Sequence, residues 1–250
     1  MKKIICLFFL LLLFSCGKEN KEINIRSGLD SIDSIGSVQE IKQEDIKDFW
    51  DLYSKTEKQI LDSFNEGDKY QNKYIADLDN KIREIDPSLS VEIKPNTDKD
   101  RVLTITANGI PELFPVVIKI AKAAPKDRLW KIEALKQRVE LPIIIDYKGT
   151  ILDSKTVEFT YKKSDDGRLE LTVYYPLVTD DNLYITYIFL DGIIGEYDTA
   201  RYIKNIEFAA KKNRAYRPLE NLRNVLDNEI KSKNKHRKRS KHENNIYGNP

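Results

Sequence analysis

The chain has 250 residues, of which 40% are hydrophobic, so it can bury a proper core in one folded domain. Lysine and arginine number 42 and aspartate and glutamate 40, and the only cysteines and histidines, Cys6, Cys16, His236 and His242, lie in the first and last segments. Zinc sites, Ser-His or Cys-His catalysts and disulfides are therefore excluded from the part between them, and we expect no metal and no cofactor.

The chain begins with a positively charged and then strongly apolar segment. Lys2 and Lys3 precede an apolar run that is too short to span a bilayer and that ends in Leu-Phe-Ser-Cys16. This pattern resembles a bacterial lipoprotein signal peptide (residues 1–15). The resemblance implies that Cys16 carries a diacylglycerol thioether and an N-acyl chain such as palmitate, which together form a stable anchor. An ordinary secretory peptide that leaves a free thiol at Cys16 is the alternative.

The residue after the anchor indicates the destination of the chain. Gly17 is not acidic, and the resemblance to sorted lipoproteins then favours the outer membrane, with the domain facing the periplasm or the cell surface. Residues 16–39 are polar, with clusters of Ser, Asp and Gly, and are expected to form a tether. The predicted location is therefore the cell envelope.

Residues 40–86 have the spacing of amphipathic helices. Apolar side chains, many of them aromatic, recur at helical intervals among charged residues. Gly67 interrupts the pattern and Pro87 ends it. We expect a helical hairpin or one long kinked helix whose aromatic stripe packs on a sheet. A groove for a partner is the alternative role of that stripe.

The periodicity changes after residue 87. Residues 91–106 alternate between apolar and polar on either side of a polar turn, which predicts a β-hairpin. Pro111 opens and Pro125 closes an apolar helical segment, and residues 129–138 alternate again as a strand. The predicted order of elements is ββαβ.

The same order recurs in the next part of the chain. Residues 157–175 predict a second hairpin with an Asp-rich turn, residues 182–192 a helix, and residues 203–214 a final strand. A strand is the alternative for residues 182–192, because they are rich in β-branched and aromatic side chains. The alternative to a repeat is chance similarity in a chain rich in Lys and Ile.

These elements define the fold class. We predict an α+β domain at residues 87–230, in which an antiparallel or mixed sheet built from two ββαβ-like units carries packed helices. The amphipathic helical segment at residues 40–86 precedes it. An extra strand at residues 141–147 lies between the units, and a helix is expected at residues 218–230.

The last segment, residues 231–250, is strongly basic. The signal contains two lysines, and residues 231–250 contain seven basic residues and one acidic residue, Glu243. The remaining residues, 16–230, therefore contain 33 basic and 39 acidic residues. Such asymmetry suggests an interaction tail for an anionic surface, and a solvated, disordered terminus is the alternative. The tail has few aromatic residues, so we do not expect nucleic acid. The candidate residues for anionic-surface binding are Lys235, Arg237, Lys238, Arg239 and Lys241.

The turn Gly195-Glu-Tyr-Asp198 is the most distinctive motif of the predicted domain. Together with Trp130 and Arg138 it resembles the C-terminal part of an uncharacterised bacterial domain family, over residues 40–211. The resemblance implies no activity, because none is firmly assigned to that family.

The carboxylates near this turn have two interpretations. In the structural one, Gly195 is the left-handed residue that ends a helix, and Glu196 and Asp198 accept hydrogen bonds from nearby backbone amides or pair with Arg201. In the functional one, Asp191, Glu196 and Asp198 bind a cation or form an acid/base pair. We favour the structural interpretation and treat the three carboxylates as weak catalytic candidates.

The ten glycines form none of the standard phosphate-binding loops, so nucleotide binding is not expected. The sequence favours a binding module over an enzyme. We therefore expect a membrane-anchored envelope lipoprotein that binds a protein or an anionic surface component. One alternative is a hydrolase that uses Glu196 and Asp198 without a cofactor, and another is a periplasmic immunity-type protein that neutralises a toxin.

Overall fold

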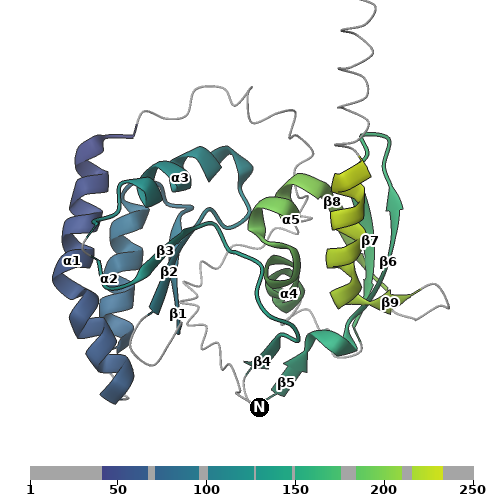
Figure 1. Ribbon diagram of the computed structural model, residues 1–250, viewed down its shortest axis with the longest axis horizontal. Coiled ribbons are helices and arrows are strands. Elements are labelled where there is room, and N and C mark those ends of the chain that lie inside the picture. Colours follow the sequence, from purple (N-terminus) through teal and green to yellow (C-terminus); the bar gives the residue numbers. More distant parts are fainter. Residues whose placement is uncertain are drawn as a thin grey trace, which may run out of the picture.

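The part of the chain that the structure describes consists of two units, each with its own mixed sheet and its own hydrophobic core (Figure 1). We call residues 41–135 the first unit, residues 136–143 the connecting segment and residues 144–232 the second unit. The computed structural model describes residues 41–66, 71–95, 101–126, 128–147, 150–175, 184–209 and 216–232. The predicted signal peptide, the tether with Cys16, and residues 233–250 of the basic tail lie outside these ranges.

In the first unit the predicted ββαβ order is confirmed. Strand β2 lies at the centre of a three-stranded sheet, antiparallel to β1 and parallel to β3. Two helices, α1 and α2, pack side by side against this sheet, which confirms the predicted helical hairpin (Figure 1). The elements are α1 (Gln43–Glu66), α2 (Gln71–Arg83), β1 (Ser90–Pro95), β2 (Arg101–Thr106), η2 (Pro111–Leu113), α3 (Phe114–Lys122) and β3 (Lys131–Ala134).

The aromatic stripe of α1 belongs to the core of the first unit. The rings of Phe49, Trp50, Tyr53 and Trp130 are buried and form successive edge-to-face pairs with centroids 4.9 to 5.8 Å apart. The indole of Trp50 also donates a hydrogen bond of 3.0 Å to the carbonyl of Ile120, which ties α1 to α3. These four rings of the stripe and the core thus pack inside the unit.

In the second unit the same topology returns. Strand β7 is antiparallel to β6 and parallel to β8, as β2 is to β1 and β3, so the predicted repeat is confirmed. Its elements are β4 (Ile144–Tyr147), β5 (Thr150–Asp153), η3 (Ser154–Thr156), β6 (Glu158–Lys163), β7 (Leu169–Tyr174), α4 (Tyr184–Ile194), α5 (Glu196–Tyr202), β8 (Ile203–Phe208), β9 (Arg217–Pro218), η4 (Leu219–Asn221) and a terminal helix at residues 222–232.

Helix α4 settles the choice that the sequence left between helix and strand. Its buried residues fall at positions 185, 186, 189, 190, 193 and 194, which is a helical stripe rather than a period of two. Because this helix is buried along most of its length, β-branched and aromatic side chains are favourable in it despite their strand propensity.

Several features of the fold differ from expectation, among them the predicted turn at residues 195–198, where Gly195 is followed directly by helix α5. Each ββαβ unit builds a separate sheet, because each sheet is covered by its own helices and the connecting segment leads into the isolated β4–β5 hairpin. Strand β5 was not predicted, and it pairs with β4 over four residues. Strand β3 is shorter than the predicted strand at residues 129–138, because Leu135 turns the chain with a φ of 64°.

The helices that the structure describes include none with the length and apolar character needed to cross a membrane. The terminal helix continues to residue 232, so the first two residues of the predicted tail are helical.

We expect Trp50→Phe to lower the free energy of unfolding by about 1 kcal/mol more than Trp130→Phe does. Both indoles are buried, but only the Nε1 of Trp50 has a hydrogen-bond partner. Chemical denaturation of both variants would measure the difference. Equal losses would show that the bond to Ile120 does not stabilise the contact between α1 and α3.

Candidate functional site

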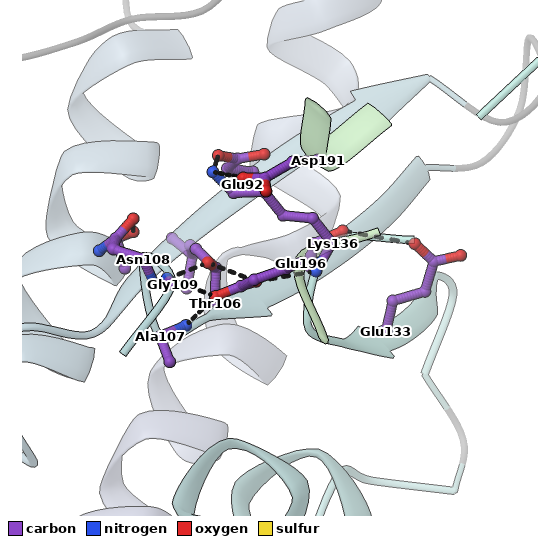
Figure 2. Close-up of polar contacts among 12 residues, drawn as sticks. Glu92, Thr106, Ala107, Asn108, Gly109, Glu133, Lys136, Asp191 and Glu196 are labelled. Carbon is purple, nitrogen blue, oxygen red and sulfur yellow. Dashed lines mark hydrogen bonds and ion pairs between the residues drawn. The ribbon is translucent and has the colours of Figure 1, made fainter. Parts of the chain in front are cut away.

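Glu196, the first residue of α5, lies between the two units with no exposed surface (Figure 2). Its carboxylate accepts four hydrogen bonds, all from residues of the first unit or the connecting segment. Oε1 accepts from the amides of Ala107 at 3.1 Å and Gly109 at 2.9 Å. Oε2 accepts from the hydroxyl of Thr106 at 2.8 Å and from the amide of Lys136 at 3.0 Å. The buried charge is thereby fully hydrogen-bonded.

The donors converge on Glu196 because the backbone takes unusual conformations on both sides. Asn108 and Gly109, which follow β2, have φ values of 51° and 78°, and this turn directs successive amides toward the carboxylate. Leu135 has a positive φ of 64°, and this turn directs both the amide and the carbonyl of the next residue, Lys136, toward Glu196. The carbonyl of Lys136 accepts a 2.9 Å hydrogen bond from the amide of Glu196, so the contact is reciprocal.

Gly195 sets the angle between α4 and α5. Its φ of 86° confirms the predicted positive value, although its ψ of 150° places it in a region used almost only by glycine rather than in the left-handed helical region. A Cβ atom at this position would lie 3.4 Å from the carbonyl oxygen of Lys136. The glycine therefore allows the close approach that the reciprocal hydrogen bonds require.

Lys136 also joins the units through its side chain. The ammonium lies 3.0 Å from the Glu92 carboxylate of β1 and 3.6 Å from the Asp191 carboxylate of α4 (Figure 2). Burial raises the pKa of Asp191 to about 7, and Lys136 opposes this rise. Burial would lower the pKa of Lys136, but the Glu92 and Asp191 carboxylates outweigh it and raise that pKa.

Asp198 pairs with an arginine of the connecting segment rather than with the expected Arg201. The guanidinium of Arg138 lies 2.8 Å from Asp198 of α5 and 2.8 Å from Asp227 of the terminal helix. Arg201 instead contacts Tyr197, with its guanidinium carbon 5.8 Å from the ring centroid and a 3.1 Å hydrogen bond to the hydroxyl.

Two arginines complete the contact by binding carbonyl groups at the end of α4. Arg138 donates to the carbonyl of Ile194 at 3.1 Å, and Arg223 donates to that of Ile193 at 2.7 Å. A second nitrogen of Arg223 donates to the carbonyl of Val139 at 2.8 Å. Cationic donors are favourable here because the last carbonyls of a helix lack intrahelical partners. We call this set of contacts around Glu196, Lys136 and Arg138 the seam.

The three candidate carboxylates are therefore near one another in sequence but have separate roles in the seam. Glu196 accepts hydrogen bonds from backbone amides and is not exposed to solvent. Asp191 forms an ion pair with Lys136, and Asp198 forms one with Arg138. Within the part of the chain that the structure describes, no group of three or more His, Cys, Asp or Glu residues is arranged to hold a metal ion. This geometry joins the two units.

A concave apolar surface lies beside the seam, where α5 meets α3. We call it the groove; its volume is about 410 Å³. The rings of Phe114 and Tyr197 lie 5.8 Å apart between centroids, and Ile118 is 37% exposed. The lining residues are Phe114, Pro115, Ile118, Lys119, Lys122 and Tyr197.

Sequence reasoning missed the groove and the donors of the seam. The Asn108-Gly109 dipeptide was the available signal for a tight turn after β2. In residues 114–122 the core positions follow a helical stripe, which leaves Ile118 as an apolar residue on the opposite face. Cys16 and the candidate tail residues Lys235, Arg237, Lys238, Arg239 and Lys241 lie outside the described residues.

Comparison of the chain with protein-family models, with curated proteins and with solved structures finds no match. The resemblance of residues 195–198 to an uncharacterised domain family stays a prediction, and the site is interpreted from its own geometry.

We expect Glu196→Gln to lower the free energy of unfolding by about 3 kcal/mol, because an amide group would face two of the four donors that now meet carboxylate oxygens. Asp198→Asn, which weakens a partly exposed ion pair, is the matched control and should cost less than about 1 kcal/mol. Thermal and chemical denaturation would measure both. An unchanged stability of Glu196→Gln would contradict the structural role.

We expect Asp191 to make the protein less stable as the pH rises from about 4 to about 7. Its pKa is raised from 3.8 to about 7 in the folded state, so the folded chain binds a proton in this range that the unfolded chain has released. We therefore expect the free energy of unfolding of the wild type, minus that of Asp191→Asn, to fall by at most about 1.4 kcal/mol per pH unit up to about pH 7. Above that pH the difference should stay constant. Parallel denaturation curves at pH 5, 6, 7 and 8 would measure it, and a difference independent of pH would refute the expectation.

Proposed function

We propose that this protein is a lipoprotein of the cell envelope, anchored to the outer membrane through lipidated Cys16, and that its folded part is a binding module for a protein partner. The observation that supports the binding role is the groove. It combines an apolar floor with cations at its rim, and it lies on the surface at the contact of α3 with α5.

The chemistry of the groove indicates what kind of segment it binds. Lys119 and Lys122 are exposed on α3, and Arg201 lies against Tyr197 on the α5 side. These positive charges contrast with the net negative charge of residues 16–230, which contain 33 basic and 39 acidic residues. A partner segment with apolar side chains flanked by carboxylates would fill the floor and pair with the rim.

The contacts of the candidate carboxylates give no support to hydrolase chemistry. A general acid or base must reach the proton that it transfers, and Glu196 is enclosed by four protein donors. Asp191 has a pKa suited to proton transfer, but it faces Lys136 in the seam and does not line the groove.

The basic tail fits the same proposal as a second membrane contact. One lipid-anchored terminus and one polybasic terminus would hold the domain close to an anionic surface, with a strength that falls as salt rises. The five candidate tail residues would act through their positive charge.

Photocrosslinking from the groove tests the binding role. A photoreactive amino acid at position 118 of the lipidated full-length protein should give a defined adduct with a protein in intact envelopes. The same probe at Leu129, which is 53% exposed but does not line the groove, is the matched control and should give none. A variant that ends at Ser232 should keep the adduct, because the tail is not part of the groove.

Two results would contradict the proposal. Equal adducts from positions 118 and 129 would show that the groove has no specificity, and the absence of any adduct from position 118 would show that it has no protein partner. The anchor is tested in the same cells, because Cys16→Ser should move the protein from the membrane fraction to the soluble fraction. Retention of that variant in the membrane would refute anchoring through Cys16.

A further inference from the structure

The chain before α1 contains a repeat of three residues. Residues 29–37 read Leu-Asp-Ser, Ile-Asp-Ser and Ile-Gly-Ser, so an apolar side chain begins each repeat. Asp30 and Asp33 follow the first two of these apolar residues. The repeat belongs to the predicted tether between Cys16 and α1, which lies outside the described residues. We call residues 29–35 the tether motif.

The tether motif and the groove have complementary chemistry. The groove has an apolar floor beside the exposed side chains of Lys119 and Lys122, which are three positions apart on α3. Neither lysine forms an ion pair with another described residue. The motif offers Leu29, Ile32 and Ile35 together with two carboxylates that are also three positions apart. It therefore has the apolar and acidic pattern that the groove requires of a bound segment.

The other parts of the two chain ends lack this pattern. Residues 231–250 contain seven basic residues and one acidic residue, so the lysines of the groove would repel them. Residues 1–15 contain no carboxylate side chain, and residues 17–28 contain three basic and two acidic residues. The tether motif has two acidic residues and no basic one. Charge thus selects the motif among the segments of the two ends.

The chain enters α1 close enough to α3 for the motif to reach the groove. The indole of Trp50 donates its 3.0 Å hydrogen bond to Ile120, which is two positions from Ile118. Helix α1 begins seven residues before Trp50, or about 10 Å along the helix. Figure 1 shows the purple start of α1 at the same end of the first unit as α3. Residues 36–42 can span up to about 25 Å, which is enough to bring the motif onto α3.

We infer that the tether motif of the same chain occupies the groove, and that the protein partner binds by displacing it. This inference rests on the proposed function and adds regulation to the same surface. Ile32 lies on the apolar floor beside Ile118 and Tyr197. Asp30 and Asp33 pair with the two lysines of α3.

The short connection to α1 makes this contact effective even where its intrinsic affinity is low. A segment joined through a few residues has an effective concentration on the order of millimolar, so a partner must compete with it. Displacement also changes the reach of the anchored domain. With the motif bound, residues 17–28 alone connect the anchor to the groove and span at most about 40 Å. With the motif released, residues 17–42 span up to about 90 Å.

Disulfide trapping within one chain tests the contact directly. The full-length lipidated protein carries Ile32→Cys and Ile118→Cys, and residues from 17 onward contain no other cysteine. A mild oxidant in intact envelopes should give a monomer in which the peptides with positions 32 and 118 are linked, as identified by mass spectrometry.

Leu129→Cys in place of Ile118→Cys is the matched control. Leu129 is 53% exposed and does not line the groove, and its amide donates a 3.1 Å hydrogen bond to Glu57 of α1. The tether can therefore reach position 129 as well. Because no complementary surface holds the motif there, the control should give no more than about a tenth of the product.

Charge reversal tests whether complementarity causes the contact. Lys119→Glu with Lys122→Glu should lower the disulfide yield roughly tenfold, and Asp30→Lys with Asp33→Lys in the same chain should restore it. Both lysines are exposed, so unchanged melting temperatures would confirm that the variants fold. A yield that is insensitive to charge reversal would overturn the inference.

Release of the motif tests the regulation. The released variant carries the substitutions Leu29→Ser, Ile32→Ser and Ile35→Ser. With the photoreactive amino acid at position 118, it should give at least about threefold more adduct with a partner protein than the unaltered tether does, because no segment of its own chain competes. Ile23→Ser with Ile25→Ser is the matched control, because it removes apolar residues of the same tether outside the motif, and it should leave the adduct yield unchanged.

The results separate this inference from the proposed function. A protein adduct from position 118 would leave the binding module intact even if the inference fails. The inference fails if release of the motif does not increase that adduct, or if the disulfide yield equals that of the Leu129→Cys control. A disulfide well above the control, without a protein adduct from either tether, would instead overturn the proposed function and the displacement step together.

Discussion

The architecture depends on one buried carboxylate that belongs to one unit and is hydrogen-bonded by the other. A charge without contact to water would cost several kcal/mol if its partners were missing, so Glu196 must keep its donors wherever the chain folds. Three of these donors are backbone amides, whose positions are set by the loop after β2 and by the end of β3. The two units therefore cannot slide or rotate against each other without exposing this carboxylate to water or removing its hydrogen-bond donors. Lys136 and Arg138 reinforce the same constraint from the connecting segment.

The repeat explains where this constraint comes from. Both units place a crossover between two parallel strands, but the first uses α3 alone while the second adds α5 after α4. Helix α5 is the helix of the second crossover that has no counterpart in the first crossover. It carries Glu196, Tyr197 and Asp198, which make the contacts with the first unit and the connecting segment. This additional helix of the second crossover thus joins the two units.

The strands and helices could be predicted because their signals are local. The alternation in β1, β2, β6 and β7 and the helical stripes of α1 and α2 are visible within ten to twenty residues. The seam could not be predicted, because the hydrogen-bond partners of Glu196 are 60 to 90 positions away in the sequence. Every residue except proline has a backbone amide, so the sequence does not show which amides will donate to a side chain. The left-handed Leu135 had no signal either, since leucine rarely adopts that conformation. The groove needs α5 to be placed against α3, which only the assembled seam determines.

The neighbouring positions of Glu196 and Tyr197 couple the docking of α5 to the formation of the groove. A chain in which only the first unit has folded presents α3 without Tyr197, and so it has an incomplete groove. The groove is complete only when α5 is docked and the carboxylate of Glu196 accepts from its amides. On the proposed function, a chain in which α5 has not docked would therefore lack the surface that binds the partner.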